Sequence, residues 1–159
     1  LAGGALLDIG TYALSLVRWF LHAQPDIVLT NMLPFETGVD EMSGIILRNS
    51  LDEMATVTLT MRAKLPKVGI IAGEEGYLEI REYPRASSFQ IRYTKDGWTA
   101  TLDAGTRGDA LVYEVRDMEA AVSGTAKNTT LDISSDVVAL MDEVRKQWGM
   151  RYPFEDEAV

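Results

Sequence analysis

The sequence predicts an α+β fold in which an open, largely antiparallel (mixed) sheet has helices packed on one face. Three observations support this class. The chain begins with an apolar helical stretch, continues with short alternating strands joined by tight turns, and returns to helical periodicity near its end. With 159 residues, 47% of them hydrophobic, it can bury a core of its own. A single domain over residues 1–159 is therefore expected.

The first predicted helix covers residues 6–22. Apolar side chains occupy most of its circumference, which is typical of a buried helix. Gly10 weakens the helix by up to about 1 kcal/mol relative to alanine. A glycine at this place also allows another backbone or a ligand to approach closely. Gln24 and Pro25 are expected to end the helix, since the residue before a proline avoids the helical conformation.

The middle of the chain, residues 26–102, has the two-residue period of β-strands. The clearest strand is 55–61, where apolar residues at 55, 57, 59 and 61 share one face. The opposite face carries Thr56, Thr58 and Thr60. Tight turns are predicted at 48–51, 73–76 and 95–97. Consecutive short strands joined in this way favour an antiparallel sheet.

The end of the chain is predicted to be helical again. One helix covers 110–123 and stops at Gly124. Its apolar stripe consists of Leu111, Val115, Met118 and Val122. Ser134 or Ser135 is expected to cap the last helix, which Gly149 ends. The apolar stripe of that helix consists of Val137, Val138, Leu140, Met141, Val144 and Trp148.

Composition and charge exclude several classes of function. The formal net charge is −9, from 24 acidic and 15 basic residues, which argues against binding to nucleic acids or to anionic membranes. No apolar run reaches the ~20 residues of a membrane span. The chain has no cysteine, which excludes disulfides and thiolate metal sites, and His22 is its single histidine. We therefore expect a cytoplasmic protein without a metal site.

Asp8 and Tyr12 are the candidates for chemistry. They are four residues apart and hence neighbours on one helix face. The preceding glycines, Gly3 and Gly4, leave backbone N–H groups open to a ligand oxygen. A tyrosine has an ordinary pKa near ~10, so Tyr12 needs a nearby cation to act as an acid or base. The alternative interpretation is structural: Asp8 favours the helix dipole and Tyr12 packs in the core.

Residues 3–12, Gly-Gly-Ala-Leu-Leu-Asp-Ile-Gly-Thr-Tyr, resemble the signature G-G-x-x-x-D-x-G-x-[HY] of the Gfo/Idh/MocA oxidoreductases. Residues 68–80 are similar to the strand–G-x-x-G–strand of that family. Tyr113-Glu114, residues 141–149 and Tyr152-Pro153 are similar to its C-terminal helices. The resemblance covers nearly the whole chain but only the second domain of the family, which has a glyceraldehyde-3-phosphate dehydrogenase-like fold.

The resemblance implies an NAD(P)-dependent oxidoreductase that acts on a sugar, polyol or diol hydroxyl. It implies that Tyr12 transfers the proton, that Asp8 orients the substrate or Tyr12, and that Gly4 and Thr11 bind substrate. NAD or NADP, together with the lysine that acts on Tyr12, would belong to an N-terminal Rossmann domain absent from this chain. Tyrosine rather than histidine at position 12 favours the branch of glucose–fructose oxidoreductase and dimeric dihydrodiol dehydrogenase.

Three expectations follow from this assignment. The chain alone should be inactive, because its partner domain would lie upstream. The open sheet face should carry a homo-oligomer interface, with a merely solvated hydroxyl face as the alternative. A non-catalytic sugar-binding regulator or an assembly domain of the same fold is the alternative function.

Overall fold

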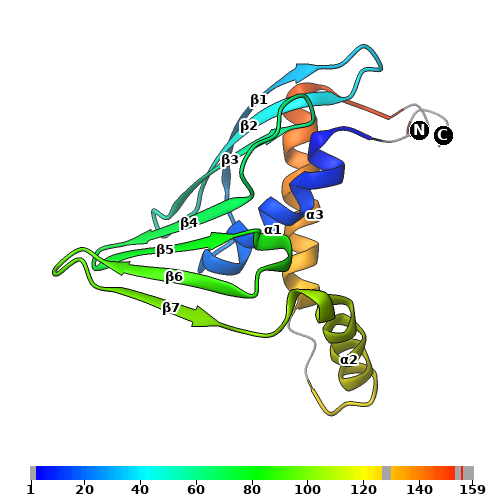
Figure 1. The fold of residues 1–159 in the computed structure, drawn as a ribbon. Coiled ribbons are helices and arrows are strands. Elements are labelled where there is room, and N and C mark those ends of the chain that lie inside the picture. Colours follow the sequence, from blue (N-terminus) through cyan, green and yellow to red (C-terminus); the bar gives the residue numbers. More distant parts are fainter. Residues whose placement is uncertain (1–2, 127–129, 153–154, 156–159) are drawn as a thin grey trace. The chain divides into compact units, whose positions relative to one another are not determined.

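The structure is a computed structural model that describes residues 3–126, 130–152 and 155 (Figure 1). Helices and antiparallel strands occur in the predicted order, which confirms the α+β class. The strands form two sheets rather than one. Residues 61–67 lie between these sheets in the chain and include Pro66, which has no N–H for a sheet ladder. The chain divides into two compact units, unit 1 (residues 1–65 and 131–159) and unit 2 (residues 66–130).

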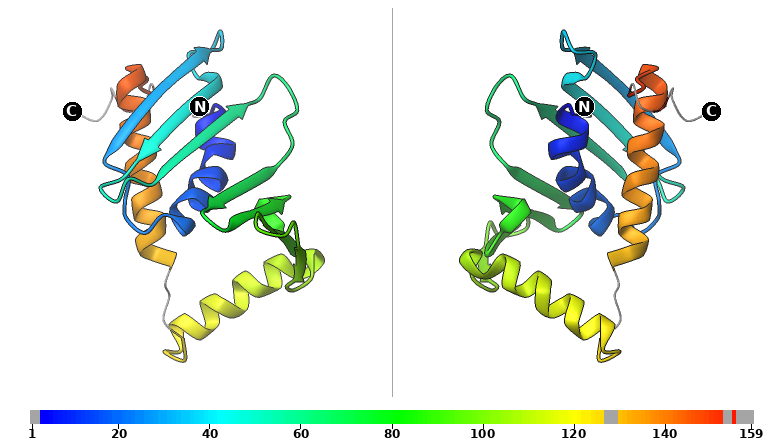
Figure 2. Two further views of the ribbon diagram at one scale, coloured as in Figure 1. Left: turned by 90° about the vertical axis from the view of Figure 1, so that its left-hand side faces the viewer. Right: turned by 90° about the vertical axis from the view of Figure 1, so that its right-hand side faces the viewer.

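Unit 1 packs helices on one face of a three-stranded antiparallel sheet with the order β1-β2-β3. A π-helical turn leads without interruption into the first α-helix. The two views of Figure 2 show the strands of this unit on one side and its helices on the other. The elements are η1 (Leu6–Gly10), α1 (Thr11–Phe20), β1 (Ile27–Pro34), β2 (Asp40–Arg48), β3 (Met54–Thr60) and α3 (Thr130–Trp148).

The central strand β2 alternates between the core and the outer face. Ile45 pairs with Val57, and Leu47 pairs with Ala55. Strand β3 contacts η1 and α1, and α3 also contributes buried apolar residues to unit 1. The fully buried apolar residues with the largest side chains are Leu6, Leu14, Ile45, Leu47 and Val144. This core holds the helix that carries the candidate chemistry against the sheet.

The end of strand β3 differs from the prediction. Val57 and Leu59 are buried and Thr56 and Thr58 exposed, as the alternation requires. Thr60, however, is buried, and Met61 is 56% exposed. The strand ends at Thr60, whose Oγ1 accepts hydrogen bonds from the backbone N–H groups of the next turn at 3.1 and 3.3 Å. The expectation that Thr60 and Met61 continue the alternation is wrong, because the hydrogen bonds from the backbone to the Thr60 hydroxyl close a turn.

Helix α3 begins earlier than the sequence predicts. It already includes Thr130, so Ser134 and Ser135 lie inside the helix rather than at its cap. Its predicted apolar stripe is buried at Val137, Leu140 and Val144, whereas Val138 is exposed. Gly149 ends the helix with a φ of +65°, as expected for a glycine stop.

Polar bonds tie α3 to the rest of unit 1. The Arg18 Nε atom on α1 donates to Asp136 Oδ2 at 2.7 Å. Trp148 Nε1 donates to Thr30 Oγ1 on β1 at 3.1 Å. These contacts connect the first half of α3 to α1 and its last residue to the sheet, so the C-terminal helix supports the N-terminal one.

Unit 2 is a four-stranded antiparallel meander followed by a helix. Its strand order is β4-β5-β6-β7, and the predicted turns at 73–76 and 95–97 are confirmed. The elements are β4 (Val68–Gly73), β5 (Gly76–Arg81), η2 (Tyr83–Arg85), β6 (Ser88–Tyr93), β7 (Thr99–Asp103), η3 (Arg107–Asp109) and α2 (Ala110–Val122). Helix α2 ends as predicted, with Gly124 at a φ of +72°.

No described side chain of unit 2 is fully buried. The apolar stripe predicted for α2 exists but is exposed, from 57% at Leu111 and Met118 to 81% at Val122. The start of α2 is fixed locally, since Tyr113 Oη accepts a hydrogen bond from Thr106 N at 3.0 Å. Backbone ladders, rather than a closed core, therefore define this unit.

Candidate functional site

The glycine pair before the first helix forms a tight turn. Gly4 has a φ of +101°, which lies in the left-handed region that favours glycine. Its carbonyl accepts a hydrogen bond from Asp8 N at 3.1 Å, and the π-helical turn η1 follows directly. Single π-turns inside α-helices occur frequently at functional sites. The motif at residues 3–12 is thus a distinct local structure and not an ordinary helix start.

Both predicted catalytic side chains lie on the exposed face of this helix. Tyr12 is 53% exposed, and Asp8 is also exposed. The opposite face carries Leu6, Gly10 and Leu14, which are buried. The structural alternative of a tyrosine packed in the core is therefore wrong, because the helix turns that phenol outward. Asp8 and Tyr12 are available to a ligand. Thr11, predicted to bind substrate, begins α1 and is half-buried.

Gly10 allows the helix to lie close to the sheet. A Cβ at this position would lie 2.9 Å from Leu59 Cδ1 on β3 and 3.1 Å from Leu6 Cδ1. The close approach expected of this glycine is made by a core side chain rather than by a ligand or another backbone. Gly10 therefore fixes the depth at which the helix sits on the sheet.

Asp40, at the start of β2, holds the beginning of η1. Its Oδ2 accepts hydrogen bonds from Leu6 N at 2.8 Å and from Ser43 Oγ at 3.3 Å. The side chain is 1% exposed, and burial raises the pKa of this carboxyl group above its ordinary value, against the opposing effect of these bonds. Since an internal carboxylate already binds the Leu6 N–H, that group is not open to a ligand oxygen, contrary to expectation.

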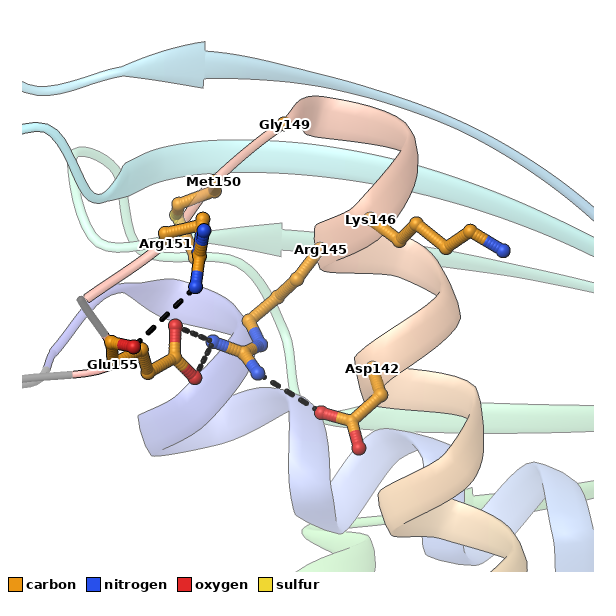
Figure 3. Close-up of a pocket in the computed structure, with 7 residues that line it drawn as sticks. All are labelled: Asp142, Arg145, Lys146, Gly149, Met150, Arg151 and Glu155. Atoms are coloured by element: carbon orange, nitrogen blue, oxygen red, sulfur yellow. Dashed lines mark hydrogen bonds and ion pairs between the residues drawn. The ribbon is translucent and has the colours of Figure 1, made fainter. Parts of the chain in front are cut away.

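The C-terminal segment holds the other side of the glycine turn. Tyr152 Oη donates to the Gly3 carbonyl at 3.0 Å, and the Tyr152 ring lies 5.0 Å beneath the Arg145 guanidinium. Figure 3 shows Arg145 between Glu155 and Asp142, at 2.8 and 3.0 Å. Arg145, Glu155 and Asp142 also line a pocket of about 440 Å³ at the end of α3. In Figure 3 the Arg145–Glu155 pair joins α3 to the segment after it, whereas the Arg145–Asp142 pair lies within α3.

His22 lies just beyond α1 in a polar cluster. Its Nδ1 lies 2.5 Å from Glu53 Oε1, and its N–H donates to Glu53 Oε2 at 2.9 Å. The buried Asn49 amide donates to the same carboxylate at 2.6 Å. Bonding from His22 and Asn49 lowers the pKa of Glu53 to about 2. The cluster fastens the end of α1 to the β2–β3 turn, and this agrees with a structural role for His22.

Two further observations concern the described residues. Within residues 3–126, 130–152 and 155, no three histidine, aspartate or glutamate side chains come together as metal ligands would. In the same ranges, every helix is too short or too polar to cross a bilayer.

Comparison with known proteins identifies the domain. Residues 1–79 match the GFO/IDH/MocA C-terminal domain. Residues 1–79 therefore belong to the C-terminal domain of the Gfo/Idh/MocA family. The match includes the whole 3–12 motif and the β1–β3 sheet. The resemblance inferred from the glycine, aspartate and tyrosine spacing is thereby confirmed, whereas the roles of the individual residues remain predictions.

Two relatives from this family are dehydrogenases. Trans-1,2-dihydrobenzene-1,2-diol dehydrogenase of Xenopus laevis is 30% identical over 96% of this chain and 49% of its own length. The scyllo-inositol 2-dehydrogenase (NADP(+)) of Bacillus subtilis is 27% identical over 96% of the chain and 47% of its own length. The chain thus spans about half the length of these relatives.

The fold is shared with solved structures. A 3-ketoreductase from Actinomadura kijaniata, crystallised with TDP-benzene and NADP, superposes with a TM-score of 0.75 at 22% identity. The superposition covers 91% of this chain and 47% of that enzyme. At this identity the likeness concerns the fold, which confirms that the α+β architecture is that of the C-terminal domains in this family.

The sequence pattern indicates the residues of the motif but not those that hold it. Asp40 lies in the stretch Thr37-Gly38-Val39-Asp40-Glu41, which has the composition of an ordinary polar turn. Only the β1–β2 pairing places this aspartate beside the first helix. Tyr152 was noted as part of the resemblance, yet its bond to a residue 149 positions earlier carries no sequence signal.

Proposed function

We propose that this chain is the substrate-side domain of an NAD(P)-dependent oxidoreductase that acts on a sugar, polyol or diol hydroxyl. One observation carries the proposal: the family motif places Asp8 and Tyr12 on the exposed face of a helix whose other face is locked into the core. The relatives, a diol dehydrogenase and an inositol dehydrogenase, support the substrate class.

In this proposal Tyr12 is the residue that moves the proton. In the oxidation direction, the Tyr12 phenolate oxygen accepts the proton of the substrate hydroxyl. The carbon that carries this hydroxyl loses its hydrogen as hydride and becomes a carbonyl carbon. Asp8 orients the substrate or Tyr12 electrostatically, and Gly4 and Thr11 contribute to substrate binding. A bound nicotinamide supplies the hydride acceptor. Forming the phenolate requires a cation, which we assign to the Rossmann domain of the full-length protein.

The chain itself does not fit the phosphates of the cofactor. The Leu6 N–H at the start of the helix is bound by the Asp40 carboxyl group, so it is not open to a phosphate oxygen. NAD or NADP is therefore assigned to the Rossmann domain. This 159-residue chain alone should bind neither cofactor tightly and should be inactive.

Cofactor reduction provides the test. The full-length protein, incubated with NAD or NADP and a panel of sugars, polyols and diols, should show an increase in absorbance of the reduced nicotinamide, while this chain alone should show none. Calorimetry on the chain alone serves as the second arm. Micromolar binding of either cofactor to the chain would overturn the assignment of that site to another domain.

We also propose a homo-oligomer that forms through the outer face of the three-stranded sheet. That face carries Thr56 and Thr58, and exposed apolar side chains surround them. The apolar residues on the three strands are Ile27, Leu29, Leu33, Met42, Ile46 and Met54, each between 41% and 64% exposed. An apolar face of this kind favours association over simple solvation. A monomer in light scattering at high concentration would contradict the proposal.

The alternative is a cytoplasmic, non-catalytic regulator or assembly domain that binds a sugar without transferring hydride. The exposed phenol and carboxylate of the motif would serve such binding equally well. Failure of the full-length protein to reduce either cofactor, combined with measurable sugar binding, would favour this alternative.

A further inference from the structure

Two buried side chains hold the Gly3–Gly4 turn from opposite sides. Asp40 Oδ2 accepts the Leu6 N–H at 2.8 Å, and Tyr152 Oη donates to the Gly3 carbonyl at 3.0 Å. Asp40 and Tyr152 are 1% and 5% exposed. They come from the start of β2 and from the segment after α3, so residues distant in sequence meet at the entrance of the motif. We call this pair the Asp40–Tyr152 clamp.

The clamp fits a glycine at position 4 and no larger residue. A Cβ on Gly4 would overlap Asp40 Oδ1 and lie 3.2 Å from Asp40 N. Asp40 Oδ1 therefore lies against the Gly4 backbone, and among the described residues it has no hydrogen-bond partner. A buried carboxylate with an unpaired oxygen destabilises a fold. Such a costly arrangement at the entrance of a candidate site suggests a function beyond packing.

The position of the clamp determines the geometry of η1. Asp8 belongs to the π-helical turn, whereas Tyr12 belongs to the α-helix that follows. A change from π-helical to α-helical winding would rotate Asp8 relative to Tyr12 about the helix axis. Because π-turns are rare and need outside support, the bonds at Leu6 N and Gly3 O are the natural restraint that keeps this turn in place.

We propose that Asp40 and Tyr152 are positioning residues that fix the direction of Asp8 relative to Tyr12. Neither side chain reaches solvent to a useful extent, so both act through the backbone of residues 3–6 rather than on the substrate. The catalytic half of this inference, the effect on kcat, rests on the proposed function. The geometric half, the effect on the conformation of residues 6–12, does not.

Kinetics of the full-length protein test the catalytic half. Tyr152→Phe removes only the hydroxyl that bonds Gly3, and Asp40→Ala removes the acceptor of the Leu6 N–H. Each should lower kcat by about 10- to 100-fold, the effect of a misplacement of about 1 Å, with little change in KM. Asp40→Asn retains an acceptor oxygen and should recover part of the loss. Asp26→Ala, at an exposed aspartate, is the matched control and should leave kcat unchanged.

Backbone amide resonances of this 159-residue chain test the geometric half without any activity. In Tyr152→Phe and Asp40→Ala, each of which removes one of the two bonds to the turn, the resonances of residues 6–12 should shift while those of the β1–β3 core stay in place. Unchanged resonances of residues 6–12 in both folded variants would overturn the clamp. Shifted resonances together with an unchanged kcat would overturn its positioning role. If the variants show the shifts but the full-length wild-type protein is inactive, the proposed function is refuted and the clamp remains a structural feature.

Discussion

The two compact units are built from similar elements but differ in what they bury. Unit 1 contains every fully buried side chain of the described residues, including Leu14 and Val144 at 0% exposure. Unit 2 has a larger sheet, with four strands against three, yet none of its described side chains is fully buried. Sheet ladders thus define strands without defining a core. The candidate site lies on the unit whose core is closed, and there the helix carrying Asp8 and Tyr12 has a fixed depth and a fixed direction.

Truncation of a leucine side chain should show the largest difference in stability effect between the two units. Leu14→Ala in unit 1 leaves a cavity and should reduce the free energy of unfolding by about 2–5 kcal/mol. Leu111→Ala on α2, where the side chain is 57% exposed, should change it by less than about 0.5 kcal/mol. Urea denaturation of both variants provides the measurement. Equal losses would show that α2 buries its stripe in solution and that the contrast between the units is wrong.

Substitution of Gly4 should produce the next largest effect, within unit 1. Gly4→Ala combines left-handed strain of about 1–2 kcal/mol with overpacking of about 1–3 kcal/mol against Asp40. Gly38→Ala is the matched control, because Gly38 also has a positive φ, +85°, but no atom lies within 4 Å of its added Cβ. The unfolding temperature of Gly4→Ala should therefore be lower than that of Gly38→Ala. Equal stability of the two would mean that Asp40 does not press on the turn.

The polar interactions of the two units should contribute to stability with different pH dependence. The pKa of Glu53 in the folded chain is about 2, below the ordinary 4.5. Its contribution to stability is therefore complete above pH 4.5 and is lost as the pH falls toward 2. Glu53→Gln should remove this part of the acid sensitivity. Glu82→Gln in unit 2, which breaks an exposed pair with Arg107 at 3.4 Å, should leave the profile nearly unchanged.

The acid-unfolding curves of wild type and both variants check this difference. If Glu53→Gln follows the wild-type curve between pH 2 and 4.5, the His22–Glu53–Asn49 cluster does not stabilise unit 1 through its charge.

Periodicity in the sequence was sufficient to predict most of the fold. The two-residue alternation located the β3 strand, and glycines at positions 124 and 149 marked the ends of the helices. Where prediction failed, a local bond or a long-range contact overrode the pattern. The Thr60 hydroxyl ended β3 one residue early, and helix α3 extended through two serines that resemble a cap. The exposure of the α2 stripe could not be predicted either, because a helical stripe does not say what covers it.

The candidate site was predictable only in part, and for a similar reason. Asp8 and Tyr12 are four residues apart, so their common face follows from helix geometry. Asp40 and Tyr152 bond to the same turn across 34 and 149 residues. No local pattern encodes such contacts, because they depend on the pairing of β1 with β2 and on the path of the chain after α3.

The most direct test of this account is the effect of Tyr12→Phe on hydride transfer by the full-length protein. Tyr12 is 53% exposed, so removal of its hydroxyl should leave the unfolding temperature nearly unchanged. Loss of the proton-transfer group should lower kcat by about 10²- to 10⁴-fold. Tyr113→Phe, on α2 of unit 2, is the matched control and should retain full activity. A Tyr12→Phe protein that reduces the cofactor at the wild-type rate would contradict the role of this helix as the proton-transfer element.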